Sequence, residues 1–261
     1  MTEEPAGRTH SVDARATRPR RIAVVPAYNE EATVRAVLET LYPHVDELIV
    51  VDDGSTDGTA AVIDAWLPGH DGARRLGFAH NRGMSAAYYL AFSDLRTRLG
   101  DGDLDARDLV FTVDADGQHD LTALDVLERV AIETGLDALI ARRDLSGYPA
   151  YKRAGNWVMS AWATLCAGRR LYDVESGYRI FRLGALADAL DYYRGYKYSE
   201  TIEVAVVLCR LGYAVRNDVV VPVPIYRSRT SFYDVGVDLV MAVVAAVRVR
   251  VGRRRRGPHA A

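Results

Sequence analysis

Short runs of apolar and β-branched residues alternate along the chain with longer segments whose apolar residues recur every three or four positions. The run Arg21–Val25 predicts a buried strand that ends at Pro26, and segment 31–41 predicts the helix that follows it. The same patterns predict strands at 47–51, 75–79, 109–113 and 138–141, and helices at 59–66, 83–99, 122–134, 151–167 and 200–211. This alternation is typical of an α/β fold, with helices covering both faces of a mostly parallel sheet.

The patterned region predicts one large domain, residues 21–233, flanked by polar and basic segments. Residues 1–20 are polar and interrupted by proline and glycine, which predicts a disordered leader rather than a signal peptide. Residues 234–251 predict a C-terminal helix. Residues 252–261, which begin with a glycine and a run of arginines, predict a basic tail.

The predicted C-terminal helix is mostly apolar, but Asp238, Arg248 and Arg250 interrupt it, and a bilayer span needs about 20 apolar residues. Two interpretations stay open. The helix and its basic tail lie on a membrane surface and bind anionic head groups, or the helix packs on the domain and the tail is solvated. The predicted helix 151–167 also has two interpretations, because its tryptophans suit either a helix that covers the sheet or one that contacts lipid.

Charge and cysteine content narrow the class of protein. The 33 Lys and Arg and 35 Asp and Glu give a formal net charge of −2, which gives no reason to expect a nucleic acid partner. The cysteines, Cys166 and Cys209, are far apart and form no metal-type pair, which favours a reduced, cytoplasmic setting.

The richest candidate chemistry follows the predicted strand at 109–113, where Asp114 and Asp116 stand one residue apart before a glycine. Side chains at i and i+2 of an extended segment point the same way, so both carboxylates can face one ligand. Two close carboxylates repel unless a cation lies between them, and hard oxygen ligands suit Mg²⁺ or Mn²⁺. The alternative is that Asp and Gly merely form the turn that ends the strand.

Three polar loops follow predicted strands, at 26–30, 52–55 and 114–116. Such loops converge at the carboxyl edge of an open α/β sheet, where Asp53 could hold a ribose or a base edge. The first strand is followed neither by Gly-x-Gly-x-x-Gly nor by a phosphate-binding Gly-x4-Gly-Lys-Ser/Thr loop, which argues against a dinucleotide fold and a P-loop NTPase.

Taken together, these motifs come in the order seen in family-2 glycosyltransferases. The matching segments are Pro26–Glu30, Asp52–Thr59, Asn81–Gly83, Asp114–His119, Asp173–Arg179, Tyr198–Glu203 and Val221–Ser231. The chain resembles the GT-A type, the nucleotide-diphospho-sugar transferase fold, and is most similar to the branch that makes polyprenyl-phosphate mannose or glucose. One departure is Met84-Ser85, where the family often has Lys or Gly after Asn-x-Gly.

The resemblance implies a role for each matched position. Asp114 and Asp116 would bind the divalent metal and the donor phosphates, Gln118 would lie beside the sugar, and the segment Ser176–Arg179 would close the acceptor side. Arg82 could reach a phosphate. The nucleoside would be lined by Pro26, Ala27, Tyr28, Glu30 and Asp53.

The chemical class of the acceptor determines which residues on the acceptor side would take part in the reaction. A hydroxyl acceptor needs a general base, whereas a phosphate monoester is already largely ionised near neutral pH and needs cations instead. Arg179, Arg227 and Arg229 lie in acceptor-side segments, and arginine matches phosphate geometry. Glu203, by its spacing to Gly212, best matches the acidic residue of the lipid-phosphate branch, and Glu200 is the second choice; both also suit the first turn of a helix with no function attached.

The sequence therefore predicts an inverting, metal-dependent glycosyltransferase at the inner face of the membrane. It would move a hexose from a GDP-mannose or UDP-glucose type donor to a polyprenyl phosphate. Transfer to a hydroxyl acceptor is the alternative, and it would make Glu200 or Glu203 an indispensable base. A nucleotidyltransferase fits less well, because its basic glycine-rich loop is missing. A catalytically silent sugar-nucleotide-binding module is a further alternative.

Overall fold

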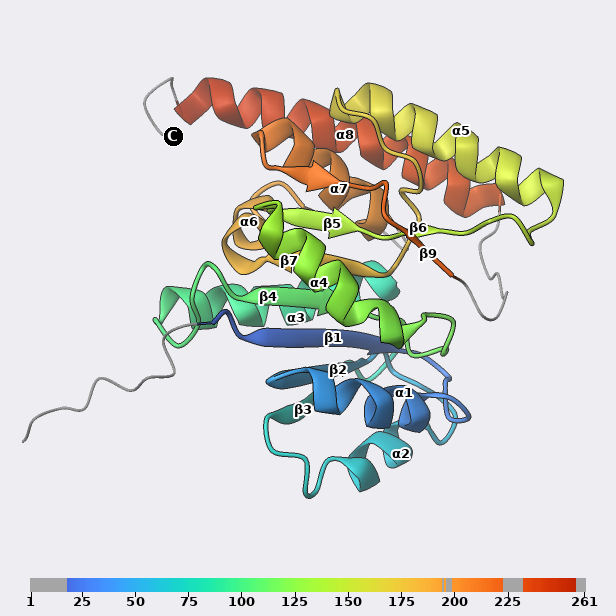
Figure 1. Ribbon diagram of the computed structural model, residues 1–261, viewed down its shortest axis with the longest axis vertical. Helices are drawn as coiled ribbons and strands as arrows, with labels where there is room; N and C mark the ends of the chain where they lie inside the picture. Colours follow the sequence, from blue (N-terminus) through green and yellow to red (C-terminus); the bar gives the residue numbers. More distant parts are fainter. Residues whose placement is uncertain (1–17, 194, 196–198, 223–231, 257–261) are drawn as a thin grey trace, which may run out of the picture.

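A computed structural model describes residues 18–193, 195, 199–222 and 232–256 (Figure 1). Its centre is a seven-stranded sheet in the order β3-β2-β1-β4-β7-β5-β8, beside a two-stranded sheet of β6 and β9. The strands are β1 (Arg21–Ala27), β2 (Glu47–Asp52), β3 (Ala73–Gly77), β4 (Leu109–Thr112), β5 (Ala138–Ile140), β6 (Arg142–Arg143), β7 (Arg179–Arg182), β8 (Val215–Arg216) and β9 (Val220–Val221). The predicted α/β class with a mostly parallel sheet is confirmed.

Helices cover both faces of this sheet, as predicted (Figure 1). Ile22 and Val24 of β1 belong to one hydrophobic core, and Ala23 and Val25 belong to the other, because side chains of a strand alternate between faces. The longer helices are α1 (Val34–Leu41), α2 (Thr59–Trp66), α3 (Met84–Gly100), α4 (Leu124–Glu133), α5 (Ala150–Ala167), α6 (Leu183–Ala189), α7 (Glu200–Leu211) and α8 (Phe232–Arg256). Helices α1, α2 and α4 pack on the second core, and α3 and α5 to α8 pack on the first.

Strand β7 is the main element that the sequence pattern missed. It lies between β4 and β5 and runs antiparallel to both, with Phe111 opposite Ile180 and Ile180 opposite Leu139. Its order in the sheet depends on the chain returning from α5, which local periodicity does not report. This insertion is what carries the segment 173–179 back to the carboxyl end of β4.

Several predicted boundaries shift in the structure. Strand β1 continues through the buried Pro26 to Ala27, with Pro26 opposite Val51 of β2. Its pairing with β4 has already ended at Val24, so Pro26 lies where β1 has a neighbour on one side alone. Strand β3 begins and ends two residues earlier than predicted. Helix α6 was not predicted. Helix α8 extends to Arg256 and so includes the arginine run assigned to the basic tail.

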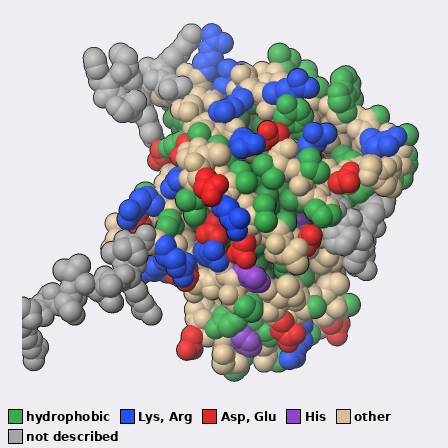
Figure 2. Space-filling model, in the orientation of Figure 1, with side chains coloured by type: hydrophobic (Ala, Val, Ile, Leu, Met, Phe, Trp, Pro, Cys, Tyr) green, Lys and Arg blue, Asp and Glu red, His purple; other side chains and the backbone are tan. Residues whose placement is uncertain are grey.

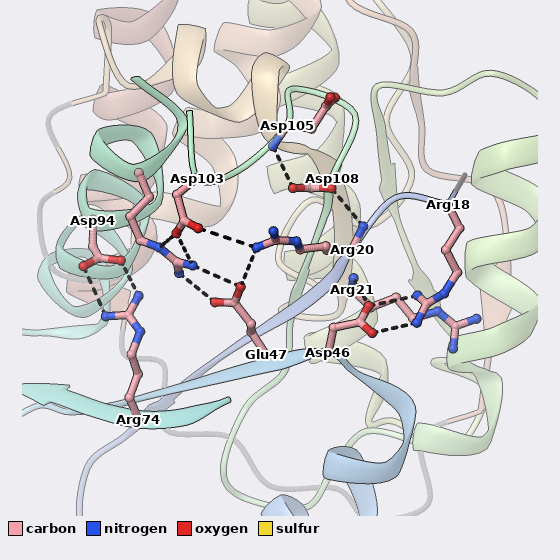
Figure 3. A network of polar contacts seen from close by, with 11 residues as sticks. Arg18, Arg20, Arg21, Asp46, Glu47, Arg74, Asp94, Asp103, Asp105 and Asp108 are labelled. Carbon is pink, nitrogen blue, oxygen red and sulfur yellow. Dashed lines mark hydrogen bonds and ion pairs between the residues drawn. The ribbon is translucent and has the colours of Figure 1, made fainter. Parts of the chain in front are cut away.

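The opposite edge of the sheet, at the amino ends of β1 and β2, is held by ion pairs (Figure 3). Arg98 of α3 donates to both carboxylate oxygens of Glu47, at 2.7 and 3.0 Å. Asp108 accepts the backbone N–H groups of Arg20 and Asp105, each at 2.8 Å. These contacts join β1, β2, α3 and the loop before β4. They hold these elements in a fixed relative position, and the loops at the opposite edge of the sheet extend from the same elements.

Residues 1–17 of the predicted leader lie outside the described part of the chain. Arg18, at its end, forms an ion pair with Asp46. Among the described residues, no helix is both long and apolar enough to cross a membrane.

Candidate active site

The loops after β1 and β2 are bonded to each other. Asn29 adopts a positive φ of 55°, which asparagine tolerates better than most residues, and this turns its backbone N–H toward the Ser55 hydroxyl at 3.1 Å. The Asn29 side chain accepts the Thr56 N–H at 2.8 Å, and Glu30 N–H donates to the Thr59 hydroxyl at 2.8 Å. The two loops therefore form one pre-shaped unit at the carboxyl edge of the sheet.

Asp53 ties this unit to the loop before α3. Its two carboxylate oxygens accept the backbone N–H groups of Arg82 and Gly83, each at 2.8 Å. Burial nevertheless raises the pKa of the Asp53 carboxyl above its ordinary value. Gly54, at φ 68°, packs so closely on the backbone of His80 that no Cβ would fit. Asp53 thus orients the loop that carries Arg82, and its oxygens keep lone pairs for a ligand.

Strand β4 ends at Thr112, so Asp114 lies in the loop that follows the strand, two residues beyond its end. The burial pattern still alternates, with Val113 and Ala115 in the core and Asp114 and Asp116 turned away from it. His119 Nε2 lies 3.0 Å from Asp114 Oδ2. Burial alone would raise the pKa of the Asp114 carboxyl, but the His119 contact and nearby arginines hold it below its ordinary value.

Gly177 lies directly against the Asp114 carboxylate. A Cβ at this glycine would fall 2.5 Å from Asp114 Oδ2, a separation that side chains do not tolerate. Its carbonyl accepts the buried Thr112 hydroxyl at 2.6 Å, which fixes the glycine against the end of β4. Segment 173–179 therefore reaches the Asp114 carboxylate only because residue 177 has no side chain.

Asp116 is held from its own turn, by the backbone N–H of Gln118 at 3.0 Å and by the Gln118 side-chain amide. No ion pair from Lys or Arg reaches Asp114 or Asp116 within the described ranges, and no ready-made cluster of three His, Cys, Asp or Glu is found there. Two neighbouring carboxylates without a Lys or Arg partner among the described residues, next to an imidazole, are a donor set that fits a divalent cation. The imidazole suits Mn²⁺ better than Mg²⁺. The residues present therefore fit the predicted metal.

A buried ion pair lies on the acceptor side. Arg179 is 1% exposed and Glu200 is fully buried, and Arg179 Nη1 donates to Glu200 Oε1 at 2.8 Å. Arg179 Nε also donates to the carbonyl of Ser176 at 2.6 Å. Among the described residues, Arg179 Nη2, Glu200 Oε2 and the Ser176 hydroxyl find no hydrogen-bond partner. Burial raises the pKa of Glu200, although Arg179 opposes the shift.

Glu203 occupies a different environment, although it shares the first turn of α7 with Glu200. Its carboxylate accepts Arg248 of α8 at 3.0 Å and the backbone N–H of Gly195 at 3.0 Å. The side chain is fully buried. Its predicted catalytic role stays a prediction, and the contacts show that it joins α7 to α8.

Arg143 is a further cation that the sequence analysis did not single out. It forms a bidentate pair with Asp173, at 2.8 Å for both Nε and Nη2, and lies 3.8 Å from Glu175. It is close enough to help hold down the pKa of Asp114. A signal was present, since Arg143 closely follows a buried strand, where site residues of α/β proteins gather.

The structure gathers most of the predicted site residues at this carboxyl edge. Tyr28 presents a partly exposed ring there, beyond the buried Pro26 and Ala27. Glu30 is buried and accepts the Thr33 hydroxyl at 3.0 Å. Arg82 lies over the Phe78 ring, 5.1 Å from its centroid. Arg227 and Arg229 lie outside the described residues.

A mostly parallel sheet with these polar loops at its carboxyl edge is the architecture expected of the GT-A fold. The family model described as glycosyl transferase family 2 matches residues 22–196, which is more than half of the chain. The chain belongs to this family, and it is therefore an enzyme that transfers sugars.

Relatives of this chain are named as transferases that use an undecaprenyl or dolichyl phosphate, as the predicted branch does. The chain is 29% identical over 201 residues to the undecaprenyl-phosphate mannosyltransferase of Micrococcus luteus, covering 74% of this chain and 79% of that one. It is 25% identical over 213 residues to the UDP-N-acetylglucosamine–dolichyl-phosphate N-acetylglucosaminyltransferase of Methanococcus voltae, covering 72% and 78%. These relatives confirm the resemblance to that branch.

A solved structure confirms the fold. Glucosyl-3-phosphoglycerate synthase of Mycobacterium tuberculosis, in complex with Mn²⁺, UDP-glucose and phosphoglyceric acid, aligns with a TM-score of 0.61. The alignment covers 89% of this chain and 80% of that chain at 20% sequence identity. At that identity the likeness is one of architecture.

Proposed function

We propose that this enzyme is an inverting, metal-dependent transferase that moves a hexose from a nucleoside diphospho-sugar to a polyprenyl phosphate. The reaction would take place at the cytoplasmic face of a membrane, where such acceptors are held. The names of the characterised relatives support this acceptor class. The observation that carries the proposal is that the two acidic side chains on the acceptor side, Glu200 and Glu203, are both buried and paired with arginines.

Both candidate bases are already bonded to arginines. Glu200 is paired with Arg179 and Glu203 with Arg248, and both carboxylates are fully buried. A hydroxyl acceptor needs a base that can take its proton, whereas a phosphate acceptor needs cations and no base. The acceptor side also holds cations. Arg179 keeps an Nη2 without a hydrogen-bond partner among the described residues, and Arg143, although paired with Asp173, lies close enough to Asp114 to lower its pKa. This arrangement favours an anionic acceptor.

On the donor side, the proposal assigns the joined loops after β1 and β2 to the nucleoside, with Tyr28 and Asp53 as its contacts. Asp114 and Asp116 would hold Mg²⁺ or Mn²⁺, and Gln118 fixes the Asp116 carboxylate for that role. A bound divalent ion would neutralise the charge of the departing diphosphate. Arg82 is placed to contact a donor phosphate from the loop that Asp53 orients.

Transfer to a hydroxyl acceptor stays a second candidate because of one observation. The pKa of Glu200 is raised and its Oε2 has no partner among the described residues, which are properties of a general base. In that version the free oxygen of Glu200 would take the acceptor proton. Arg179 would then serve to orient the carboxylate.

The deciding experiment offers the enzyme two matched acceptors. A short polyprenyl phosphate and the corresponding polyprenol are each incubated with Mn²⁺ and a panel of UDP- and GDP-linked sugars, and the products are separated by mass. Product on the phosphate alone is expected. Product on the polyprenol alone would overturn the acceptor assignment and support Glu200 as the base. Nucleotide binding without any transfer would support the silent-module alternative.

A further inference from the structure

The surface formed by α5 and α8 carries most of the exposed large apolar side chains of the described chain. Nine of the fourteen such residues lie on these two helices. The nine are Tyr151, Trp157, Val158, Trp162, Leu165, Val240, Val243, Val247 and Val251. Single exposed apolar residues are normal on a soluble protein, but a contiguous group of this size marks an interaction surface.

Helix α5 shows this most clearly. Tyr151, Val158, Trp162 and Leu165 recur at helical spacing along its outward face, and Trp157 and Leu165 are 71% and 69% exposed. From residue 154 to the end of the helix there is no charged side chain at all. A helix that only covered the sheet would place polar residues on its solvent side. The outward face of α5 therefore suits contact with an apolar phase better than contact with water.

Helix α8 continues the same surface. Val240, Val243, Val247 and Val251 are spaced as one stripe of the helix and are 40–60% exposed. The indole N–H of Trp162 donates to the backbone carbonyl of Leu239 at 2.9 Å, which joins the two outward faces at their crossing. The two helices lie side by side as the outer layer of the molecule, away from α1 and α2 (Figure 1).

Basic residues frame this surface. Where the structure describes their side chains, α5 and α8 carry four Lys and Arg and one acidic residue, although the whole chain has a formal charge of −2. That acid, Asp238, is buried, and one of the cations, Arg248, is bonded to Glu203. Arg153 and Arg250 are exposed at the margins, and Arg169 is exposed just beyond the end of α5. Hydrophobic and basic side chains mix over the upper part of the molecule in Figure 2, where these helices lie.

We infer that the α5–α8 surface is a docking face for an anionic lipid bilayer, with both helices lying in the plane of the interface. Apolar stripes with basic margins are the pattern of interfacial helices, in which Trp and aliphatic side chains enter the head-group region and Arg contacts anionic lipid. A second copy of the chain is a poor occupant, because pairing two such faces would bring their arginines together without acidic partners.

The docking face is continuous with the acceptor side of the site, and its interpretation as a membrane face rests on the proposed function. Helix α5 begins seven residues after Arg143, and the chain returns from α5 to the segment that carries Asp173 and Arg179. Helix α8 contacts the first turn of α7 through Arg248 and Glu203. A bilayer under α5 and α8 would present a lipid phosphate beside the arginines of the site.

The test compares two double variants of the full chain in vesicle sedimentation. W157S/L165S removes apolar side chains from the docking face, and V126S/I132S removes exposed apolar side chains from α4 on the other side of the sheet. Vesicles of phosphatidylcholine with and without phosphatidylglycerol are used at low and high salt. We expect salt-sensitive binding to the anionic vesicles, a loss of about tenfold or more for W157S/L165S, and no change for V126S/I132S.

Activity on a short, water-soluble polyprenyl phosphate separates this inference from the proposed function. W157S/L165S should turn over that acceptor as the wild type does, because neither side chain belongs to the site. Equal vesicle binding by both double variants, or binding that ignores lipid charge, would overturn the docking face. A dimer that dissociates in W157S/L165S would assign the face to a second copy instead. Vesicle binding without transfer to any acceptor would overturn the proposed function alone.

Discussion

Arg179 Nη1 donates a 2.8 Å hydrogen bond to Glu200 Oε1 in the interior of the protein, and each side chain keeps one polar atom unbonded among the described residues. Removing one partner of such a pair leaves an uncompensated buried charge. The pair therefore has measurable consequences for stability and for the reaction.

R179M should lower the free energy of unfolding by about 3–5 kcal/mol, because it leaves the Glu200 carboxylate buried without its cation. Urea unfolding at neutral pH measures the loss. The matched control is R35M, which breaks the exposed pair with Glu39 and should cost at most about 1 kcal/mol. Equal losses in the two variants would show that the buried pair has no special role.

E200Q should reveal the raised pKa of Glu200 through the pH dependence of stability. A carboxyl group whose pKa is raised on folding contributes stability at acid pH and loses it as pH rises through the folded pKa. E200Q also leaves Arg179 buried without its anion, so it should be less stable than the wild type at acid pH. Because glutamine does not titrate, the wild-type advantage should shrink as pH rises toward 7. Urea unfolding across this range tests the sign, and a wild-type advantage that grows with pH would contradict it.

G177A should impair catalysis more than folding. The new Cβ would lie 2.5 Å from Asp114 Oδ2, so either the carboxylate or the 173–179 segment has to shift. A displacement of about 1 Å in a positioned group can cost about a hundredfold in rate. The control is G100A at the end of α3, where a Cβ meets nothing within 4 Å and the backbone is helical. A G177A enzyme with wild-type kcat would show that the Asp114 position is not critical.

D116N should remove the response to metal. Asp116 lacks a Lys or Arg partner among the described residues, so its charge is available to Mn²⁺. We expect the variant to lose the rise in Tm that Mn²⁺ and a nucleotide sugar produce together, and to lose about a hundredfold or more in turnover. D120N is the matched control in the same loop, because Asp120 caps the following turn through Thr122 and asparagine can do the same.

E203Q should distinguish the two acceptor mechanisms. General-base catalysis contributes about 10²–10⁴-fold, so loss of a base would show at once in kcat. Because the Glu203 carboxylate is engaged by Arg248 and by the Gly195 N–H, we expect E203Q to keep transfer to a polyprenyl phosphate within about tenfold of wild type. A loss of about a hundredfold or more with normal unfolding would restore Glu203 as a catalytic residue.

The sequence by itself determined the class of fold and the donor-side loops. Strands such as 21–25 and 47–51 are nearly continuous apolar runs, and a helical pattern follows each, so a parallel sheet is the arrangement that buries them. Parallel order in turn places the loops after β1, β2 and β4 at one edge. The contacts of Asn29 with Ser55 and of Asp53 with Arg82 then join loops that this parallel order brings to the same edge.

Tertiary structure alone decided the acceptor side. The antiparallel insertion of β7 brings Gly177 to Asp114 and Arg179 to Glu200 from segments that no local pattern connects. Glu200 and Glu203 share the first turn of one helix, yet one pairs with the site and the other with α8. Their different partners, and the exposure of the apolar face of α5, arise from how whole elements pack, which residue spacing along the chain does not encode.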